Sequence, residues 1–348
     1  MSADHSEKSP DPLVEDPPLP SYVQLEPVGQ CNLKCTMCAI QFRTDGAPGT
    51  PPAFMAFDTF VRLVDGFASL RDLHLQGLGE PMMHPRFFDM IAYATARGIR
   101  VTTNTNLTLL GPRRAERLVT SGLACLHVSV DGATDATYAS IRVGGRLQRV
   151  LENLRAFVDA RGRLRSASPS LHLVMVVMRR NLAELPGLVR IAADMRAEQL
   201  FVQHLCHDFG EPGLPAAYGP MREFVEAETL AGESPERVGA AFDEARALAS
   251  ELGVDLRLPR PTPRAHRPST PGRERCQWPW TGAYVSYQGL SMPCCMISTP
   301  DRLNFGNIAE AGVAATWHGS SYASFRRQLD SDDPPAICRS CSVYKGTF

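Results

Sequence analysis

Short apolar runs alternate with amphipathic segments along the first 205 residues. The runs are rich in β-branched residues or alternate apolar with polar positions, as strands do, and lie at 21–28, 72–78, 99–105, 123–130, 170–178 and 199–205. Between them, apolar residues recur at helical spacing, for example Phe57, Phe60 and Val64, with Asp58 as the expected N-cap. Strands that alternate with helices pair in parallel through crossovers, so the pattern predicts an α/β fold, either a partial barrel or an open sheet.

The chain divides by composition into four parts. Residues 1–19 are polar and rich in proline, and we expect a disordered leader there. Residues 20–205 carry the strand–helix units. Residues 206–275 are mainly helical at first, but 257–275 hold five prolines and six arginines, which predicts a linker. Residues 276–348 form a small unit that bears cysteines.

Charge and hydropathy exclude several classes of function. The 348 residues carry a net charge of −1, so no global field attracts nucleic acid or an anionic membrane. The longest strongly apolar run, 171–178, is much shorter than the roughly 18 residues that span a bilayer. The N-terminus lacks the apolar segment of a signal peptide, so we expect a cytoplasmic location, with no membrane and no nucleic acid as partner.

Polar motifs follow the predicted strands at their carboxyl ends. Three cysteines follow the first strand, "GLGEP" follows the second, and asparagines and a serine end the third and fourth. The loops at this end of a parallel barrel carry active sites, so these residues are expected to meet in one site. They are Cys31, Cys35, Cys38, Gly77, Gly79, Glu80, Asn104, Asn106 and Ser129.

Ten cysteines in a chain without a secretion signal indicate metal or redox chemistry rather than disulfides. The first group, with Cys-x3-Cys-x2-Cys spacing, supplies three thiolates and leaves a fourth position unexplained. A second group comprises Cys276, Cys294, Cys338 and Cys341, with Cys295 as an alternative to Cys294. Structural zinc is the competing interpretation of each group. Cys125 and Cys206 lie in apolar contexts and are expected to be buried bystanders.

The cysteine triplet, "GLGEP" and "SVDGATDATYASIRVGG" together resemble radical S-adenosylmethionine (SAM) enzymes of the SPASM/twitch branch. The resemblance implies a partial (β/α)6 TIM-like barrel in which three cysteines bind a [4Fe–4S] cluster and SAM completes the fourth iron. It implies that Glu80 binds the SAM ammonium, that Ser129 and Arg142 hold its carboxylate, and that Asn104 or Asn106 meets the ribose. Gly77 and Gly79 would let the backbone approach the ligand.

The same resemblance implies reductive cleavage of SAM to a 5′-deoxyadenosyl radical that abstracts hydrogen from substrate. A flavodoxin- or ferredoxin-type protein would supply the electron. The C-terminal pattern, Cys276, then Gly289-x4-Cys294, then Cys338-x2-Cys341, resembles a truncated SPASM domain. It implies one auxiliary [4Fe–4S] cluster with four protein ligands.

The substrate is expected to be a small metabolite, of the sugar, aminocyclitol or nucleoside type, because the leader is too short to form a peptide-recognition domain. Oxidation or decarboxylation in natural-product biosynthesis would follow. A maturase that modifies a ribosomal peptide is the alternative, and a non-catalytic electron carrier or zinc scaffold is the third hypothesis. His204, His207, Asp208 and Glu211 lie in the region where a base is needed, but the pattern selects none of them.

Overall fold

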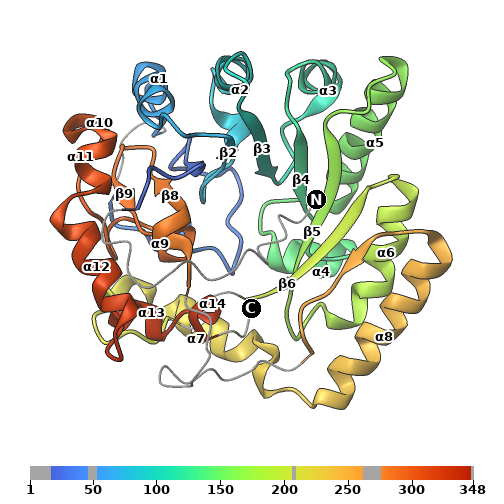
Figure 1. Cartoon of the computed structure of the whole chain (residues 1–348). Helices are drawn as coiled ribbons and strands as arrows, with labels where there is room; N and C mark the ends of the chain where they lie inside the picture. The colour runs from blue at the N-terminus through green and yellow to red at the C-terminus, as the bar shows by residue number, and fades with distance from the viewer. Residues whose placement is uncertain (1–16, 46–52, 206–208, 262–275, 346–348) are drawn as a thin grey trace.

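The computed structural model describes residues 17–45, 53–205, 209–261 and 276–345. One curved sheet of nine strands forms a half-barrel, in the order β7-β6-β5-β4-β3-β2-β1-β8-β9 (Figure 1). All neighbours pair in parallel except β8 and β9. The strands are β1 Tyr22–Leu25, β2 Asp72–Leu75, β3 Arg100–Thr105, β4 Cys125–Ser129, β5 Ser170–Val177, β6 Gln199–His204, β7 Leu256–Arg257, β8 Gly282–Val285 and β9 Ser291–Met292.

Helices cover the outer face of the half-barrel and bury their apolar sides against the strands (Figure 1). In the first 261 residues they are α1 Phe57–Gly66, α2 Phe87–Thr95, α3 Gly111–Val119, α4 Asp135–Ile141, α5 Leu147–Arg163, α6 Leu185–Asp194 and α8 Pro235–Leu252. Helix α7 Gly219–Glu228 instead packs against the cysteine loop, where it buries Met221 and Val225. Helix α1 buries Phe60 and Val64 as its spacing predicts. Its N-cap is Ala56, so the prediction of Asp58 as the cap is wrong; Asp58 lies in the first turn, where its charge favours the helix dipole.

All six strands predicted from the sequence are present, and the α/β partial barrel is confirmed. Their polar inward faces and apolar outward faces follow from the two-residue period of a strand. In β5, for example, Leu171, Leu173 and Val177 belong to the core under the helices. Gly98 and Gly122 follow α2 and α3 with φ of 74° and 87°, a backbone conformation that favours glycine after a helix.

The C-terminal unit extends the barrel sheet and is not a separate layer. Strand β8 pairs in parallel with β1, with Tyr22 opposite Gly282 and Leu25 opposite Val285. Short helices complete the unit: α9 Trp278–Thr281, α10 Ile308–Ala311, α11 Val313–Trp317, α12 Ser320–Asp330, α13 Ala336–Arg339 and α14 Ser342–Lys345. The C-terminal unit is therefore held at a fixed place beside the rim of the barrel.

Two segments outside the predicted barrel core also contribute to the fold. Within 206–275, the described residues include α7, α8 and the short strand β7 at the sheet edge. Pro17 and Pro18, at the end of the expected leader, accept hydrogen bonds from the indole nitrogen of Trp317 at 3.1 and 3.0 Å. These last residues of the leader therefore pack against the C-terminal unit. Among the described helices, none combines the length and apolar character needed to cross a bilayer.

Candidate functional site

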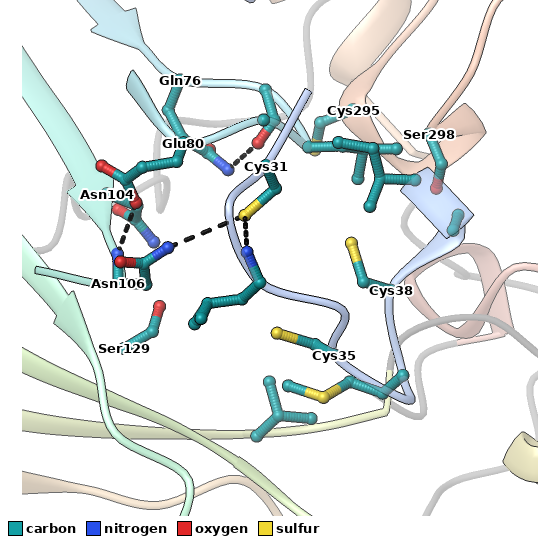
Figure 2. Close-up of a pocket in the computed structure, with 18 of the residues that line it drawn as sticks. Cys31, Cys35, Cys38, Gln76, Glu80, Asn104, Asn106, Ser129, Cys295 and Ser298 are labelled. Atoms are coloured by element: carbon teal, nitrogen blue, oxygen red, sulfur yellow. Dashed lines mark hydrogen bonds between the residues drawn. The ribbon is translucent and has the colours of Figure 1, made fainter. Parts of the chain in front are cut away.

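The loop after β1 carries the cysteine triplet and docks on the end of α4 and the residues just after it. Lys34 N donates to Val143 O at 2.8 Å and Thr36 N donates to Ile141 O at 3.0 Å. The two contacts fix the loop at the carboxyl end of the sheet. Figure 2 shows the thiols of the three cysteines pointing into one cavity from this loop.

A cavity of about 300 Å³ lies between this loop and the strand ends. It is lined by every residue that the sequence predicts for the SAM site: Cys31, Cys35, Cys38, Gly77, Gly79, Glu80, Asn104, Asn106, Ser129 and Arg142. These residues come from five consecutive segments of the chain, and the parallel order of β1 to β4 brings them to one edge. The fold brings the motifs together at one site, as the sequence predicts. The roles of these residues toward a cofactor stay predictions.

Glu80 is a buried carboxylate, 2% exposed, that the protein satisfies with hydrogen bonds but not with a cation. Its oxygens accept from Thr105 Oγ1 at 2.6 Å, Asn106 N at 2.8 Å and Met82 N at 3.1 Å. Among the described residues, no lysine, arginine or histidine forms an ion pair with it. Burial raises the pKa of Glu80 above its ordinary value, and the hydrogen bonds and, more weakly, the charge of Arg142, which forms no ion pair with it, act in the opposite direction. A cationic ligand in the cavity would supply the missing charge.

The two glycines before Glu80 are required by the packing of the protein itself. A Cβ on Gly79 would lie 1.9 Å from Val28 O and 2.5 Å from Gln30 O, which are backbone atoms. A Cβ on Gly77 would lie 2.3 Å from the Cγ of Glu26. The family resemblance implies that these glycines let a ligand approach the backbone closely. The structure gives a different reason: they let the β2 loop lie directly against the chain that leads into the cysteine loop.

Asn104 near the end of β3 and Asn106 just after it differ in how the protein uses them. The Asn106 side chain donates to Asn32 Oδ1 at 3.1 Å and to Cys31 Sγ at 3.7 Å, and accepts from Thr108 Oγ1 at 2.6 Å. The Asn104 side chain has no hydrogen-bond partner within the described residues, although it lines the cavity. Asn106 therefore orients a thiol of the triplet, and Asn104 is the asparagine available to a ligand (Figure 2).

Arg142 reaches the cavity from the end of α4 and is held there by a buried acid. Its Nε donates to Asp131 Oδ2 at 2.5 Å, and Asp131 is fully buried. Its Nη1 lies 3.8 Å from Cys35 Sγ, close enough to donate to the sulfur. Burial raises the pKa of the Cys35 thiol, and the neighbouring guanidinium opposes that shift. Arg142 thus stabilises negative charge where the thiolates would bind iron, and Ser129 lines the same cavity.

A buried ion pair that the sequence analysis missed ties three parts of the site together. Glu26, fully buried at the end of β1, accepts from Arg43 Nη1 at 3.0 Å, Leu78 N at 3.1 Å and Tyr287 N at 3.4 Å. These donors belong to the cysteine loop, the "GLGEP" loop and the C-terminal unit. Arg43 also pairs with Asp45 at 2.6 Å. The only sequence signal for this ion pair is that a glutamate directly follows an apolar strand.

The second group of cysteines surrounds a smaller apolar cavity in the C-terminal unit. It is lined by Cys276, Cys294, Cys338 and Cys341 together with apolar and aromatic residues. Burial, and the proximity of the other thiols, raise the pKa of Cys294 well above its ordinary value. Four converging thiols in apolar surroundings fit a metal centre, because a bound metal replaces the thiol protons and offsets the negative charge.

Cys294 and Cys295 point to different cavities. Cys294 has extended backbone, with φ of −168° and ψ of 169°, and successive side chains of an extended chain point to opposite sides. Cys294 lines the cavity of the C-terminal unit, whereas Cys295 lines the rim cavity together with the triplet (Figure 2). The geometry therefore favours Cys294 over Cys295 as the fourth thiol of the second group. It also places a fourth cysteine, with Ser298, in the rim cavity, which no motif predicted.

Of the residues considered as bases, the two that the structure describes, His204 and Glu211, do not line the cavity. His204 Nε2 lies 2.9 Å from Arg260 O, and Glu211 is paired with Arg302, whose Nε donates to it at 2.9 Å. His207 and Asp208 lie outside the described residues. The wall that β6 contributes is formed by Gln203 and Leu205. No catalytic base is assigned.

A parallel half-barrel with three thiols and a carboxylate that lacks a cation at its rim, plus a four-thiol centre beside it, defines an iron–sulfur enzyme. Residues 25–190 match the model of the Radical SAM superfamily, and residues 276–342 match SPASM, an iron–sulfur cluster-binding domain. The chain belongs to the radical SAM superfamily and carries a C-terminal SPASM domain. It is a radical SAM enzyme, with a [4Fe–4S] cluster and SAM as cofactors and auxiliary iron–sulfur binding in the SPASM domain.

Relatives with different names match nearly the whole chain. A tungsten-containing aldehyde ferredoxin oxidoreductase cofactor-modifying protein of Pyrococcus furiosus is 30% identical over 92% of this chain and 87% of its own length. A PqqA peptide cyclase of Xanthomonas campestris is 27% identical, covering 93% and 80%. An AdoMet-dependent heme synthase of Methanosarcina barkeri is 26% identical, covering 94% and 89%.

Solved structures show the same fold. Streptococcus suis SuiB bound to the precursor peptide SuiA superposes with a TM-score of 0.65 at 16% identity, over 94% of this chain and 71% of SuiB. Native anSMEcpe with bound AdoMet and a peptide gives 0.63 at 15% identity, over 95% and 88%. At these identities the similarity establishes the architecture and leaves the substrate open.

Proposed function

We propose that the protein cleaves SAM at the rim cavity and abstracts hydrogen from a small metabolite, in an oxidation or a decarboxylation. When bound, a reduced [4Fe–4S] cluster supplies the electron that converts SAM to methionine and a 5′-deoxyadenosyl radical. Cys31, Cys35 and Cys38 would hold that cluster. The observation that carries the proposal is the convergence of three thiols, Glu80 and Arg142 on one cavity.

Residues of different charge in the cavity would bind different groups of SAM. Glu80, without a cation of its own, would accept the SAM ammonium, and Arg142 and Ser129 would hold its carboxylate. Asn104 is the asparagine proposed for the ribose, because Asn106 is engaged with Cys31 and Asn32. Gln203 and the C-terminal residues around Cys295 are left to face the substrate.

One auxiliary [4Fe–4S] cluster, held by Cys276, Cys294, Cys338 and Cys341, is proposed for the C-terminal unit. The four thiols around one apolar cavity support it. With all four positions taken by protein, this cluster would not bind SAM but would accept one electron from the substrate radical left after hydrogen abstraction, which completes a two-electron oxidation of the substrate. The electron for SAM cleavage would come from a flavodoxin- or ferredoxin-type protein, and the reaction would take place in the cytoplasm.

A small substrate is favoured by two of the relatives, whose names describe a cofactor-modifying protein and a heme synthase and whose lengths are covered to 87% and 89%. A peptide maturase is the second candidate, because PqqA peptide cyclases match 93% of this chain. The two candidates differ in what increases the formation of 5′-deoxyadenosine above background: a metabolite, or a short ribosomal peptide.

The test is anaerobic incubation of the reconstituted protein with dithionite and SAM, followed by chromatography for 5′-deoxyadenosine. The wild type is expected to form it, and a Cys31→Ala/Cys35→Ala/Cys38→Ala variant is expected to form none while it keeps the iron of one cluster. Deuterated candidate metabolites should transfer deuterium to 5′-deoxyadenosine. No 5′-deoxyadenosine from wild-type protein that holds both clusters would refute the proposed function.

A further inference from the structure

Inside the half-barrel, one layer below the rim cavity, a thiol and two imidazoles converge. Cys125 and His127 are two residues apart on β4 and therefore share its inward face. His172 lies directly opposite His127 on β5. The ligating atoms of the three side chains all lie within 4.8 Å of one another. The rim cavity begins two residues further along these strands, at Ser129 and Val174, so this cluster is separate from it.

The separation between Cys125 and His127 is that of two ligands in a tetrahedral metal site. Cys125 Sγ lies 3.6 Å from His127 Nε2. Bonds of about 2.3 Å from zinc to sulfur and about 2.0–2.1 Å to nitrogen, at a tetrahedral angle, separate the two ligand atoms by about 3.6 Å. A thiol, two imidazoles and no carboxylate form the donor set that zinc-class ions prefer over magnesium or calcium.

A backbone carbonyl and burial both leave His127 in the form that binds a metal. Its Nδ1 lies 3.3 Å from Thr103 O, and a carbonyl only accepts, so Nδ1 carries the proton and the lone pair of Nε2 faces Cys125. A carbonyl behind a ligating imidazole is the usual second interaction of metal-bound histidine. Burial lowers the pKa of His127 to about 3, so the ring is neutral at physiological pH.

The neighbouring His74 provides an internal comparison. Its ring packs edge-on against His127 with centroids 6.0 Å apart, but both of its nitrogens are already used. Nδ1 lies 2.7 Å from Thr102 Oγ1 and Nε2 lies 3.1 Å from Gln76 Oε1. His74 is therefore in the same row of side chains without being available to a metal.

We propose that Cys125, His127 and His172 bind a divalent ion of the zinc class inside the barrel, with the fourth position open to solvent or a small ligand. The thiolate offsets one of the two charges of the ion. Glu198 and Asp255 add negative charge near His172, while Arg100 opposes it. In this proposal Cys125 is a ligand rather than the buried bystander that its apolar sequence context suggests.

The proposal is tested on the full chain with its iron–sulfur clusters reconstituted, so that the other cysteine groups are occupied. After dialysis against buffered Zn²⁺, metal analysis should find one zinc per wild-type chain. Cys125→Ala and His172→Ala should each lose it with unchanged iron content, and the matched control His74→Gln should keep it. X-ray absorption at the zinc edge should show one sulfur at about 2.3 Å and lighter ligands at about 2.0–2.1 Å.

Wild-type protein without stoichiometric zinc, or equal zinc in the wild type and Cys125→Ala, would overturn the proposal. The result would then mean that the 3.6 Å contact is a thiol–imidazole hydrogen bond within a packed interior. The absorption measurement uses wild-type protein alone, so the test does not depend on the variants folding. An absorption spectrum that shows no sulfur ligand, or more than one, on the zinc would also contradict the proposal, because the site offers one thiolate.

Discussion

Replacing Glu80 by glutamine tests whether its carboxylate binds the ammonium group of SAM. The side chain is 2% exposed and has hydrogen-bond donors but no cationic partner among the described residues. A hydrogen bond to a charged group contributes about 1.5–3 kcal/mol. Since about 1.4 kcal/mol changes a dissociation constant tenfold, Glu80→Gln is expected to weaken SAM binding by about 10- to 150-fold.

The same change should affect folding stability much less. Glutamine can keep the oxygen that accepts from Thr105 and Met82, and it loses the hydrogen bond from Asn106 N. Relief of the desolvated charge offsets that loss, so the free energy of unfolding without SAM should change by less than about 1.5 kcal/mol. Loss of binding without loss of stability separates a ligand contact from a structural role.

The pH dependence of stability gives a second readout with a definite sign. Burial raises the pKa of Glu80 above its ordinary 4.5, so the folded protein retains this proton to higher pH than the unfolded chain. Its contribution to stability is complete below the unfolded pKa and is lost as pH rises through the folded pKa. Glu80→Gln should remove that part of the pH dependence.

The assay is anaerobic calorimetric titration of SAM into proteins matched for iron content. Glu152→Gln on the exposed side of α5, where the side chain is 51% exposed, is the matched control and should bind SAM as the wild type does. A Glu80→Gln protein that binds SAM within threefold of wild type would refute the assignment of Glu80 to the ammonium group.

Three further predictions concern the links around the site. Glu26→Gln removes the buried partner of an arginine and should lower the free energy of unfolding, measured with urea on the cluster-free protein, by about 3 kcal/mol; a loss below 1 kcal/mol would contradict this. Cys294→Ala should lose about four irons per chain and Cys295→Ala none, so equal losses would disprove the assignment. Arg326→Met, which removes buried donors to two carbonyls, should cost about 2–4 kcal/mol, while Arg327→Met on the exposed side of α12 should change stability by less than about 0.5 kcal/mol.

The sequence predicted the barrel strands because each depends on a local pattern of side chains. The run at 170–178 became β5 Ser170–Val177 and the run at 123–130 became β4 Cys125–Ser129. The same local pattern missed β8 Gly282–Val285 as a barrel neighbour. Its partner β1 lies about 260 residues earlier, and parallel pairing over such a separation leaves no mark on either segment alone.

By itself the sequence determined that the cysteine triplet and the polar motifs after β2 to β4 meet at the rim cavity, because the carboxyl ends of parallel strands meet at one edge and the motifs follow those strands. Tertiary structure decided how they are used. Only the packing shows that Gly79 makes room for Val28 O, that Asn106 serves Cys31 while Asn104 is left for a ligand, and that Cys295 faces a different cavity from Cys294. Each of these depends on where a side chain points relative to a distant segment, and residue type and spacing do not carry that information.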